Sequence, residues 1–151
     1  MAKRVAGFGT TVFVEINELA RLHAAVNLGQ GAPDFDGSPE VLAAAVRAVN
    51  GALNQYAPGI GMSSVREAIA RHAERFYGQK LDPESEVLVT SGATEGMFAA
   101  ILGLTDPGDE VILQTPYYFN HEMAITMASC KPVLVPTDAD YQLQPDAIRS
   151  A

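Results

Sequence analysis

A turn of small residues between two apolar stretches could bind an anion. Ser91-Gly92-Ala93-Thr94 follows the run EVLVT and precedes a stretch with helical spacing that ends near Leu104. A helix that begins in such a turn leaves its first backbone N–H groups without partners, and its dipole adds partial positive charge there. Small side chains let a phosphate or carboxylate approach these groups. Taken alone, the turn is better explained by Thr94 as a simple N-cap and Gly92 as a simple turn residue.

Other chemistries fit the sequence less well. The stretch HEMAI at residues 121–125 begins like a zinc-binding helix, but Ile125 stands where the second ligand belongs. His23 and His72 have no partner at ligand spacing, so we expect no metal site. Ser91 lacks the flanking residues of a nucleophile elbow, and the nearby glycines do not form the GxGxxG pattern of a nicotinamide site.

The composition is that of a soluble α/β protein with one domain. The chain has 151 residues, a formal net charge of −8 and an isoelectric point near 4.7. This acidity argues against a nucleic-acid or acidic membrane surface, which would need an excess of lysine and arginine. No apolar stretch at the N-terminus is long enough for a signal peptide or a membrane span, and the single Cys130 cannot form an internal disulfide. We therefore expect a cytoplasmic protein.

The first half of the chain is predicted to contain an arm and two well-marked helices. Residues 1–36 show little regular pattern apart from a short helix at 14–24, and LGQGAPDFDGSP is rich in turn formers. A helix is predicted from Ser38-Pro39 to Asn50-Gly51. Another begins with the capping box Ser64–Glu67 and ends at Gly78. Its inward face is predicted to consist of Val65, Ala68, Ile69, His72 and Phe76.

From residue 86 the pattern alternates between strands and helices. Strands are predicted at 86–90, 110–114 and 132–135, with helices at 95–104 and 118–129 between them. Valine, leucine and isoleucine runs joined by crossover helices predict a three-layer α/β fold, with a parallel sheet covered on both faces. Ligands bind at the carboxyl ends of such strands, where the small-residue turn lies. Three strands leave open edges and the last predicted helix, which begins at Gln144-Pro145, stops abruptly, so we expect a truncated chain.

Four stretches occur in the order and at the separations of one known family. They are VNLGQGAPDF at 26–35, NQYAPGIG at 54–61, TSGATEG at 90–96 and DEVILQTPYYFN at 109–120. The chain resembles pyridoxal-phosphate-dependent aminotransferases of fold type I, class I/II, in the branch that includes kynurenine and methionine aminotransferases. The resemblance runs over the whole chain but covers only the N-terminal portion of such an enzyme. It implies an N-terminal arm and substrate-side loop at 1–36, and the N-terminal part of the large, cofactor-binding domain at 37–151.

The resemblance also implies which residues hold the phosphate of pyridoxal 5'-phosphate. By position, this role falls on the turn and helix start at Gly92, Ala93 and Thr94, the last of which can add its hydroxyl group. Glu95 is a possible obstacle, because a carboxylate in the first helical turn competes with the phosphate unless it points away.

Further site residues follow from the same resemblance. Tyr118 aligns with an aromatic ring that stacks on the pyridine ring of the cofactor, and the neighbouring Tyr117 is its rival. Tyr56 matches a tyrosine that crosses a homodimer interface to the partner's cofactor phosphate. Gly31 matches a backbone position that meets the substrate carboxylate, and Phe13 falls where an aromatic residue lines that pocket.

The implied reaction moves an amino group between an amino acid and a 2-oxo acid. It depends on a Schiff-base lysine, an aspartate and an arginine that lie further along the chain in such enzymes. Lys3, Lys80 and Lys131 stand in the wrong contexts, so no catalytic residue is assigned and the 151 residues alone are expected to be inactive. Two alternatives stay open: another fold type I enzyme, of the C–S lyase or cyclopropane-carboxylate synthase type, and a non-catalytic interaction module.

Overall fold

The computed structural model describes all 151 residues, which group into two compact units. One unit consists of Met1–Phe8 and Pro58–Ala151, and the other consists of Gly9–Ala57. The predicted boundary between residues 36 and 37 divides the chain differently and stays a prediction. None of the helices combines the length and the hydrophobicity that a membrane span requires.

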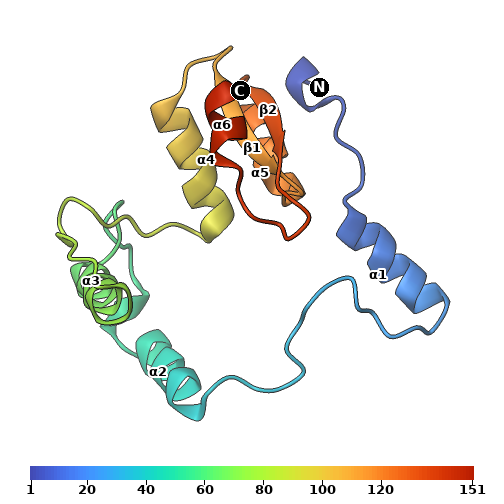
Figure 1. Cartoon of the computed structure of the whole chain (residues 1–151). Helices are drawn as coiled ribbons and strands as arrows, with labels where there is room; N and C mark the ends of the chain where they lie inside the picture. The colour runs from blue at the N-terminus through green and yellow to red at the C-terminus, as the bar shows by residue number, and fades with distance from the viewer. The chain divides into compact units, whose positions relative to one another are not determined.

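A parallel two-stranded sheet organises the larger unit (Figure 1). Strand β1 (Glu110–Thr115) pairs with β2 (Lys131–Pro136), so that the first residues of the two strands are opposite each other and so are the last. Helix α4 (Ala93–Leu104) precedes β1, α5 (Phe119–Met127) connects the strands, and α6 (Pro145–Ser150) contacts β2. The predicted α/β class with a parallel sheet is confirmed. Because α4 leads into β1 and α5 leaves it, both helices begin at the carboxyl edge of the sheet.

Only two of the three predicted strands form. Residues 86–90 have no neighbouring strand, and their one backbone bond to a distant segment joins Val89 N to Ile60 O at 3.1 Å. A strand is defined by a ladder of bonds to a neighbour, and a hydrophobic run without one stays irregular. The prediction of a strand at 86–90 is therefore wrong for this chain.

The hydrophobic core of this unit lies between β1 and helices α4 and α5. Leu113, Ile125, Ala128 and Cys130 are buried, and four partly buried residues pack against them: Phe98, Ile101, Val111 and Tyr117. Ile125 is only 2% exposed, and burial of such a side chain contributes about 1.5–3 kcal/mol. The core fixes both helices against the strand, and so it also fixes where the two helix N-termini lie.

Helix α3 (Ser63–Tyr77) ends as predicted but begins and packs differently. Gly78 closes it in the left-handed conformation with φ of 66°. The predicted capping box is wrong, because the N-cap residue is Met62 and the hydroxyl of Ser63 donates to Glu67 at 3.0 Å. The predicted inward face is also wrong: Val65, Ala68, Ile69, His72 and Phe76 are all exposed.

The buried face of α3 is organised around Arg66, which is 4% exposed. Its guanidinium donates to the carbonyl oxygens of Gly61 and Pro83 and to the Glu84 carboxylate, the last at 3.2 Å. Buried arginines are stable only when such acceptors surround them. Through Arg66 the helix packs against polar backbone of its neighbouring loops, and Ala73 is its only other buried residue.

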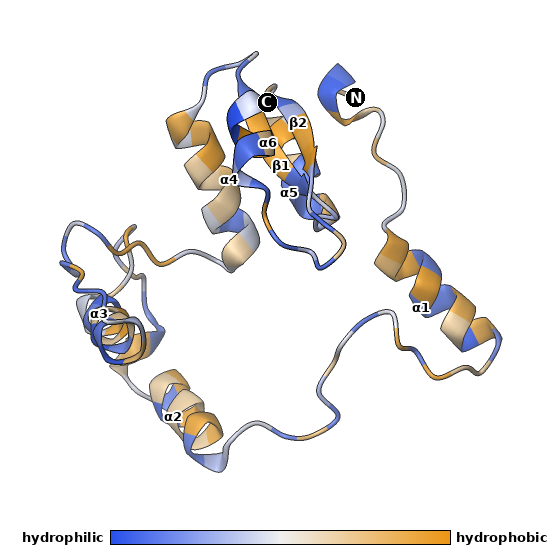
Figure 2. Ribbon diagram, in the orientation of Figure 1, coloured by the Kyte–Doolittle hydropathy of each residue, from blue (hydrophilic) through white to orange (hydrophobic).

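The unit Gly9–Ala57 contains two helices and one short 3-10 turn. Helix α1 spans Val12–Leu22, α2 spans Pro39–Asn50 and the turn spans Ala52–Asn54. The helix predicted from Ser38-Pro39 to Asn50-Gly51 is confirmed. Figure 2 shows many hydrophobic residues on α1 and α2, yet neither helix has a buried residue. Most of these apolar side chains are exposed, while Phe13 and Ile16 on α1 are half-buried.

Candidate cofactor site

Gly92 turns the chain sharply from residues 86–91 into helix α4. Its φ of 86° and ψ of 170° lie in a region that residues with a side chain rarely adopt. Thr90 holds the turn from both sides, because its hydroxyl donates to Gly92 O at 3.0 Å and its carbonyl accepts from Gly92 N at 2.8 Å. The backbone conformation alone therefore favours glycine at position 92.

The start of α4 presents backbone donors that the helix does not use. Gly92, the N-cap residue, provides no side-chain cap. The N–H groups of Ala93, Thr94 and Glu95 precede the first turn of intrahelical hydrogen bonds, and the first bond back to the N-cap comes from Gly96 N at 3.3 Å. With the positive end of the helix dipole behind them, these amides suit a phosphate group. The residues present thus fit the phosphate of pyridoxal 5'-phosphate.

Glu95 does not reach across this donor group. Its carboxylate accepts a hydrogen bond from the backbone N–H of Ser91, which folds the side chain back over the residue before the N-cap. This contact resembles the carboxylate half of a capping box but lies one residue earlier, and it occupies Ser91 N–H rather than an amide of the first helical turn. The competition expected between Glu95 and a phosphate is reduced accordingly.

The two neighbouring tyrosines after β1 have different surroundings. The ring of Tyr117 packs against the hydrophobic core, and its hydroxyl donates to Glu122 at 2.6 Å. This hydrogen bond raises the pKa of Tyr117 above its ordinary value. Tyr118 is the N-cap residue of α5 and is 45% exposed. The arrangement favours Tyr118 over Tyr117 as the ring that could meet a ligand.

Three side chains at the start of α5 contact the ring of Tyr118. The amide of Asn120 donates to the Tyr118 hydroxyl at 3.0 Å. The His121 ring lies edge-on at a centroid distance of 5.8 Å, and the Phe119 ring is 4.8 Å away. The ring of Tyr118 is thereby held at the strand-to-helix junction, as stacking on a flat ligand would require.

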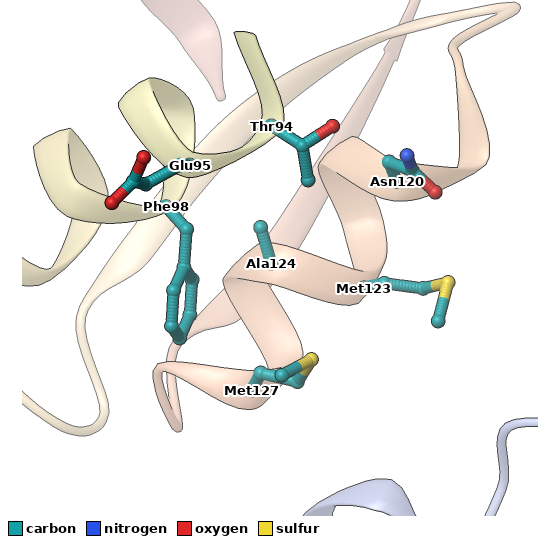
Figure 3. A pocket seen from close by; sticks show the side chains of 7 residues that line it. All are labelled: Thr94, Glu95, Phe98, Asn120, Met123, Ala124 and Met127. Atoms are coloured by element: carbon teal, nitrogen blue, oxygen red, sulfur yellow. The ribbon is translucent and has the colours of Figure 1, made fainter. Parts of the chain in front are cut away.

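A pocket of about 340 Å³ lies between α4 and α5. It is lined by Thr94, Glu95, Phe98, Asn120, Met123, Ala124 and Met127. Figure 3 shows Thr94 and Asn120 at the same end of this pocket, each on the first turn of its helix. The structure therefore brings the predicted phosphate turn and the segment of Tyr118 to one edge of the sheet.

The remaining predicted residues belong to the unit Gly9–Ala57. Phe13 lies on α1, Gly31 follows the loop that packs on α1, and Tyr56 is fully exposed. The loop approaches α1 closely, since a Cβ at Gly29 would stand 2.7 Å from the Ile16 side chain. Their roles toward a ligand at Gly92 stay predictions.

Sequence reasoning missed Thr90, Asn120 and Glu122. A signal existed for Glu122, because it stands five residues after Tyr117, the spacing of a contact between the residue before an N-cap and the fourth helical residue. Thr90 and Asn120 carry no such signal. Each bonds to a residue only two positions away, Thr90 to Gly92 and Asn120 to Tyr118, and the residue types alone do not mark these contacts.

Comparisons with known proteins give the family. The model of the family described as aminotransferase class I and II matches residues 24–151. The chain is 48% identical over 151 residues to the probable N-succinyldiaminopimelate aminotransferase of Mycobacterium tuberculosis, covering 98% of this chain and 38% of that protein. It is 45% identical over 120 residues to the methionine aminotransferase of Escherichia coli, covering 80% of this chain and 31% of that protein.

The solved structures agree with this result. The structure of N-succinyldiaminopimelate aminotransferase from Mycobacterium tuberculosis matches with a TM-score of 0.93 and 47% identity, over 100% of this chain and 40% of that one. The chain thus spans about two-fifths of the length of the relatives it matches. It belongs to the class I and II aminotransferases, a family of pyridoxal-phosphate enzymes of fold type I.

Proposed function

We propose that these residues form the phosphate-binding and ring-stacking part of an aminotransferase that moves an amino group between an amino acid and a 2-oxo acid. The observation that carries this proposal is the junction of two helix N-termini at the carboxyl edge of the sheet. One presents the open amides that follow Gly92, and the other presents Tyr118. Membership of the aminotransferase family supports the assignment of the ligand as pyridoxal 5'-phosphate.

Each residue has a role in binding rather than in bond breaking. The amides that follow Gly92 bind the phosphate dianion, and the Thr94 hydroxyl adds one donor. The Tyr118 ring holds the flat face of the cofactor in a fixed plane. The cofactor, when bound, supplies an electron sink for the bonds at the α-carbon of the amino acid. The groups that move protons and bind the substrate carboxylate belong, in this proposal, to a whole protein of the relatives' length.

We further propose that this whole protein is a cytoplasmic homodimer. In this arrangement Tyr56 reaches the cofactor phosphate of the partner subunit, while Gly31 and Phe13 lie on the substrate side. The complete exposure of Tyr56 is compatible with such a role, since nothing in its own unit covers the ring. Dimers with a two-fold axis are the most common closed assemblies of soluble proteins.

An overall transamination assay tests the proposed transfer. The whole protein, loaded with pyridoxal phosphate, is mixed with one amino donor and 2-oxoglutarate, and the new amino acid is measured by chromatography. The donors are N-succinyldiaminopimelate, methionine and an aromatic amino acid. We expect transfer with at least one of them, and transfer with none would contradict the proposal. Release of a 2-oxo acid from an S-substituted cysteine without any acceptor would instead favour a lyase.

The phosphate role is tested separately from turnover. Replacement of Thr94 by valine removes the hydroxyl and keeps the size of the side chain, while the backbone amides remain. We expect the Kd for pyridoxal phosphate to rise by roughly ten- to 150-fold, the effect of losing one hydrogen bond to a charged group, which contributes about 1.5–3 kcal/mol. Thr105→Val is a matched control, since the Thr105 hydroxyl donates to Ile101 O at 2.7 Å near the opposite end of α4. An equal change in both variants would contradict a specific role for Thr94.

A further inference from the structure

The chain enters α5 through a side-chain contact that spans the helix start. Tyr118 is the N-cap residue and Phe119 the first helical residue, so Tyr117 directly precedes the cap and Glu122 is the fourth residue of the helix. The Tyr117 hydroxyl donates to the Glu122 carboxylate at 2.6 Å, and this is the only hydrogen bond of either side chain. The hydrogen bond between these two side chains thus spans the N-cap residue Tyr118.

A contact between these two positions fixes the angle at which a chain enters a helix. It is usually apolar and is known as a hydrophobic staple. Here a hydrogen bond to a charged acceptor closes it, and such bonds are shorter and stronger than neutral ones. The ring of Tyr117 is itself held, because it packs against the core around Leu113 and Ile125. The staple therefore connects the junction to the rigid part of the unit.

We propose that Tyr117 and Glu122 act as a hydrogen-bonded staple that sets the orientation of the Tyr118 ring toward the cofactor. Tyr117 is then a positioning residue, which acts through its neighbour and does not touch the ligand. The inference rests on the proposed function, because it assigns the staple to the ring that would stack on pyridoxal phosphate. Asn120 supports the same ring from the other end, through its bond to the Tyr118 hydroxyl.

The experiment compares variants that break the staple with one that leaves it intact. Tyr117→Phe removes only the hydroxyl, and Glu122→Gln keeps an acceptor oxygen but loses the charge. Tyr141→Phe is the matched control, because Tyr141 is 73% exposed and its hydroxyl makes no hydrogen bond. For each variant of the whole protein, the Kd for pyridoxal phosphate, the visible circular dichroism of the bound cofactor and the melting temperature without cofactor are measured.

We expect Tyr117→Phe to raise the Kd by about three- to tenfold and to weaken the visible dichroism, which reports the asymmetric contacts of the bound ring. Glu122→Gln should change both in the same direction but less, since the amide oxygen still accepts the hydrogen bond. Tyr141→Phe should match the wild type. If Tyr117→Phe fails to fold, the change in visible dichroism of Glu122→Gln tests the proposal by itself.

Two outcomes would overturn the proposal that the staple orients Tyr118. Wild-type Kd and dichroism in both staple variants would show that the Tyr118 ring is oriented without it. A lower melting temperature without a change in dichroism would reduce Tyr117 to a purely structural residue. Failure of the proposed function gives a different result: Tyr118→Ala would then bind pyridoxal phosphate as tightly as the wild type, or the wild type would bind none.

Discussion

Replacing Gly92 by alanine adds one methyl group where there is space for it but the backbone conformation is unsuitable. No heavy atom lies within 4 Å of the added Cβ, so no clash opposes it. The backbone at φ 86° and ψ 170° is nevertheless in a region almost restricted to glycine. Holding a residue with a side chain there costs about 1–3 kcal/mol. The variant must either carry this strain or change the turn.

Both responses weaken binding at the start of α4. A relaxed turn would reorient the amides that follow Gly92, and a strained turn would lower the stability of the state that binds. A cost of about 1–3 kcal/mol corresponds to a rise in Kd of roughly five- to 150-fold. We expect Gly92→Ala of the whole protein to fall in this range when titrated with pyridoxal phosphate.

Gly103→Ala provides the matched control in the same helix. Its Cβ would also meet nothing within 4 Å, but Gly103 has no positive φ. Alanine there should stabilise α4 by up to about 1 kcal/mol through helix propensity, with an unchanged Kd. Urea unfolding measures the stability and the titration measures the Kd. Wild-type affinity in Gly92→Ala, or an equal loss in both variants, would refute the reasoning.

Four further results are expected. Tyr56→Phe should weaken cofactor retention in the whole protein without lowering its melting temperature, and unchanged retention would count against a phosphate role. Arg66→Met should cost roughly 2–4 kcal/mol in urea unfolding, since it leaves buried carbonyl oxygens without a donor. Borohydride treatment of the 151 residues with pyridoxal phosphate should label no specific lysine. Lys131, for example, begins β2 about 17 Å along the strand from the carboxyl end, where the proposed cofactor site lies. Stoichiometric labelling of one lysine would contradict this expectation. The pKa of Tyr117 is raised in the folded protein, so the hydrogen bond of its hydroxyl stabilises the fold below the ordinary value of 10.0 and stops doing so as the pH rises through the raised pKa. The melting temperature of Tyr117→Phe should therefore fall less in alkali than that of the wild type.

Features with a local cause could be predicted from the sequence. The helix from Pro39 to Asn50 begins with a proline in its first turn and ends before a glycine, and both signals act within a few residues. The strands at β1 and β2 are continuous apolar runs between turn residues, and their parallel pairing follows from the helix that connects them. The order of four short stretches was sufficient to identify the family, and with it the turn at Gly92.

Features that depend on a distant partner required the tertiary structure. Residues 86–90 have the composition of a strand, but a strand forms only where another backbone completes its hydrogen bonds. The inward face of α3 is set by Arg66 and the carbonyl oxygens of neighbouring loops, which a hydrophobic pattern does not reveal.

At the site, the two adjacent tyrosines show the same contrast between what the sequence predicts and what only the tertiary structure decides. Tyr117 and Tyr118 have the same side chain and are adjacent in the sequence, and in the sequence only the family resemblance favoured Tyr118. The core and Glu122 hold Tyr117, while Tyr118 becomes the cap of α5 and stays partly exposed. Sequence by itself determined that an aromatic ring follows β1 next to an anion-binding turn. Only the tertiary structure decided which ring is available, because the direction of a side chain at a strand-to-helix junction depends on what packs against its neighbour.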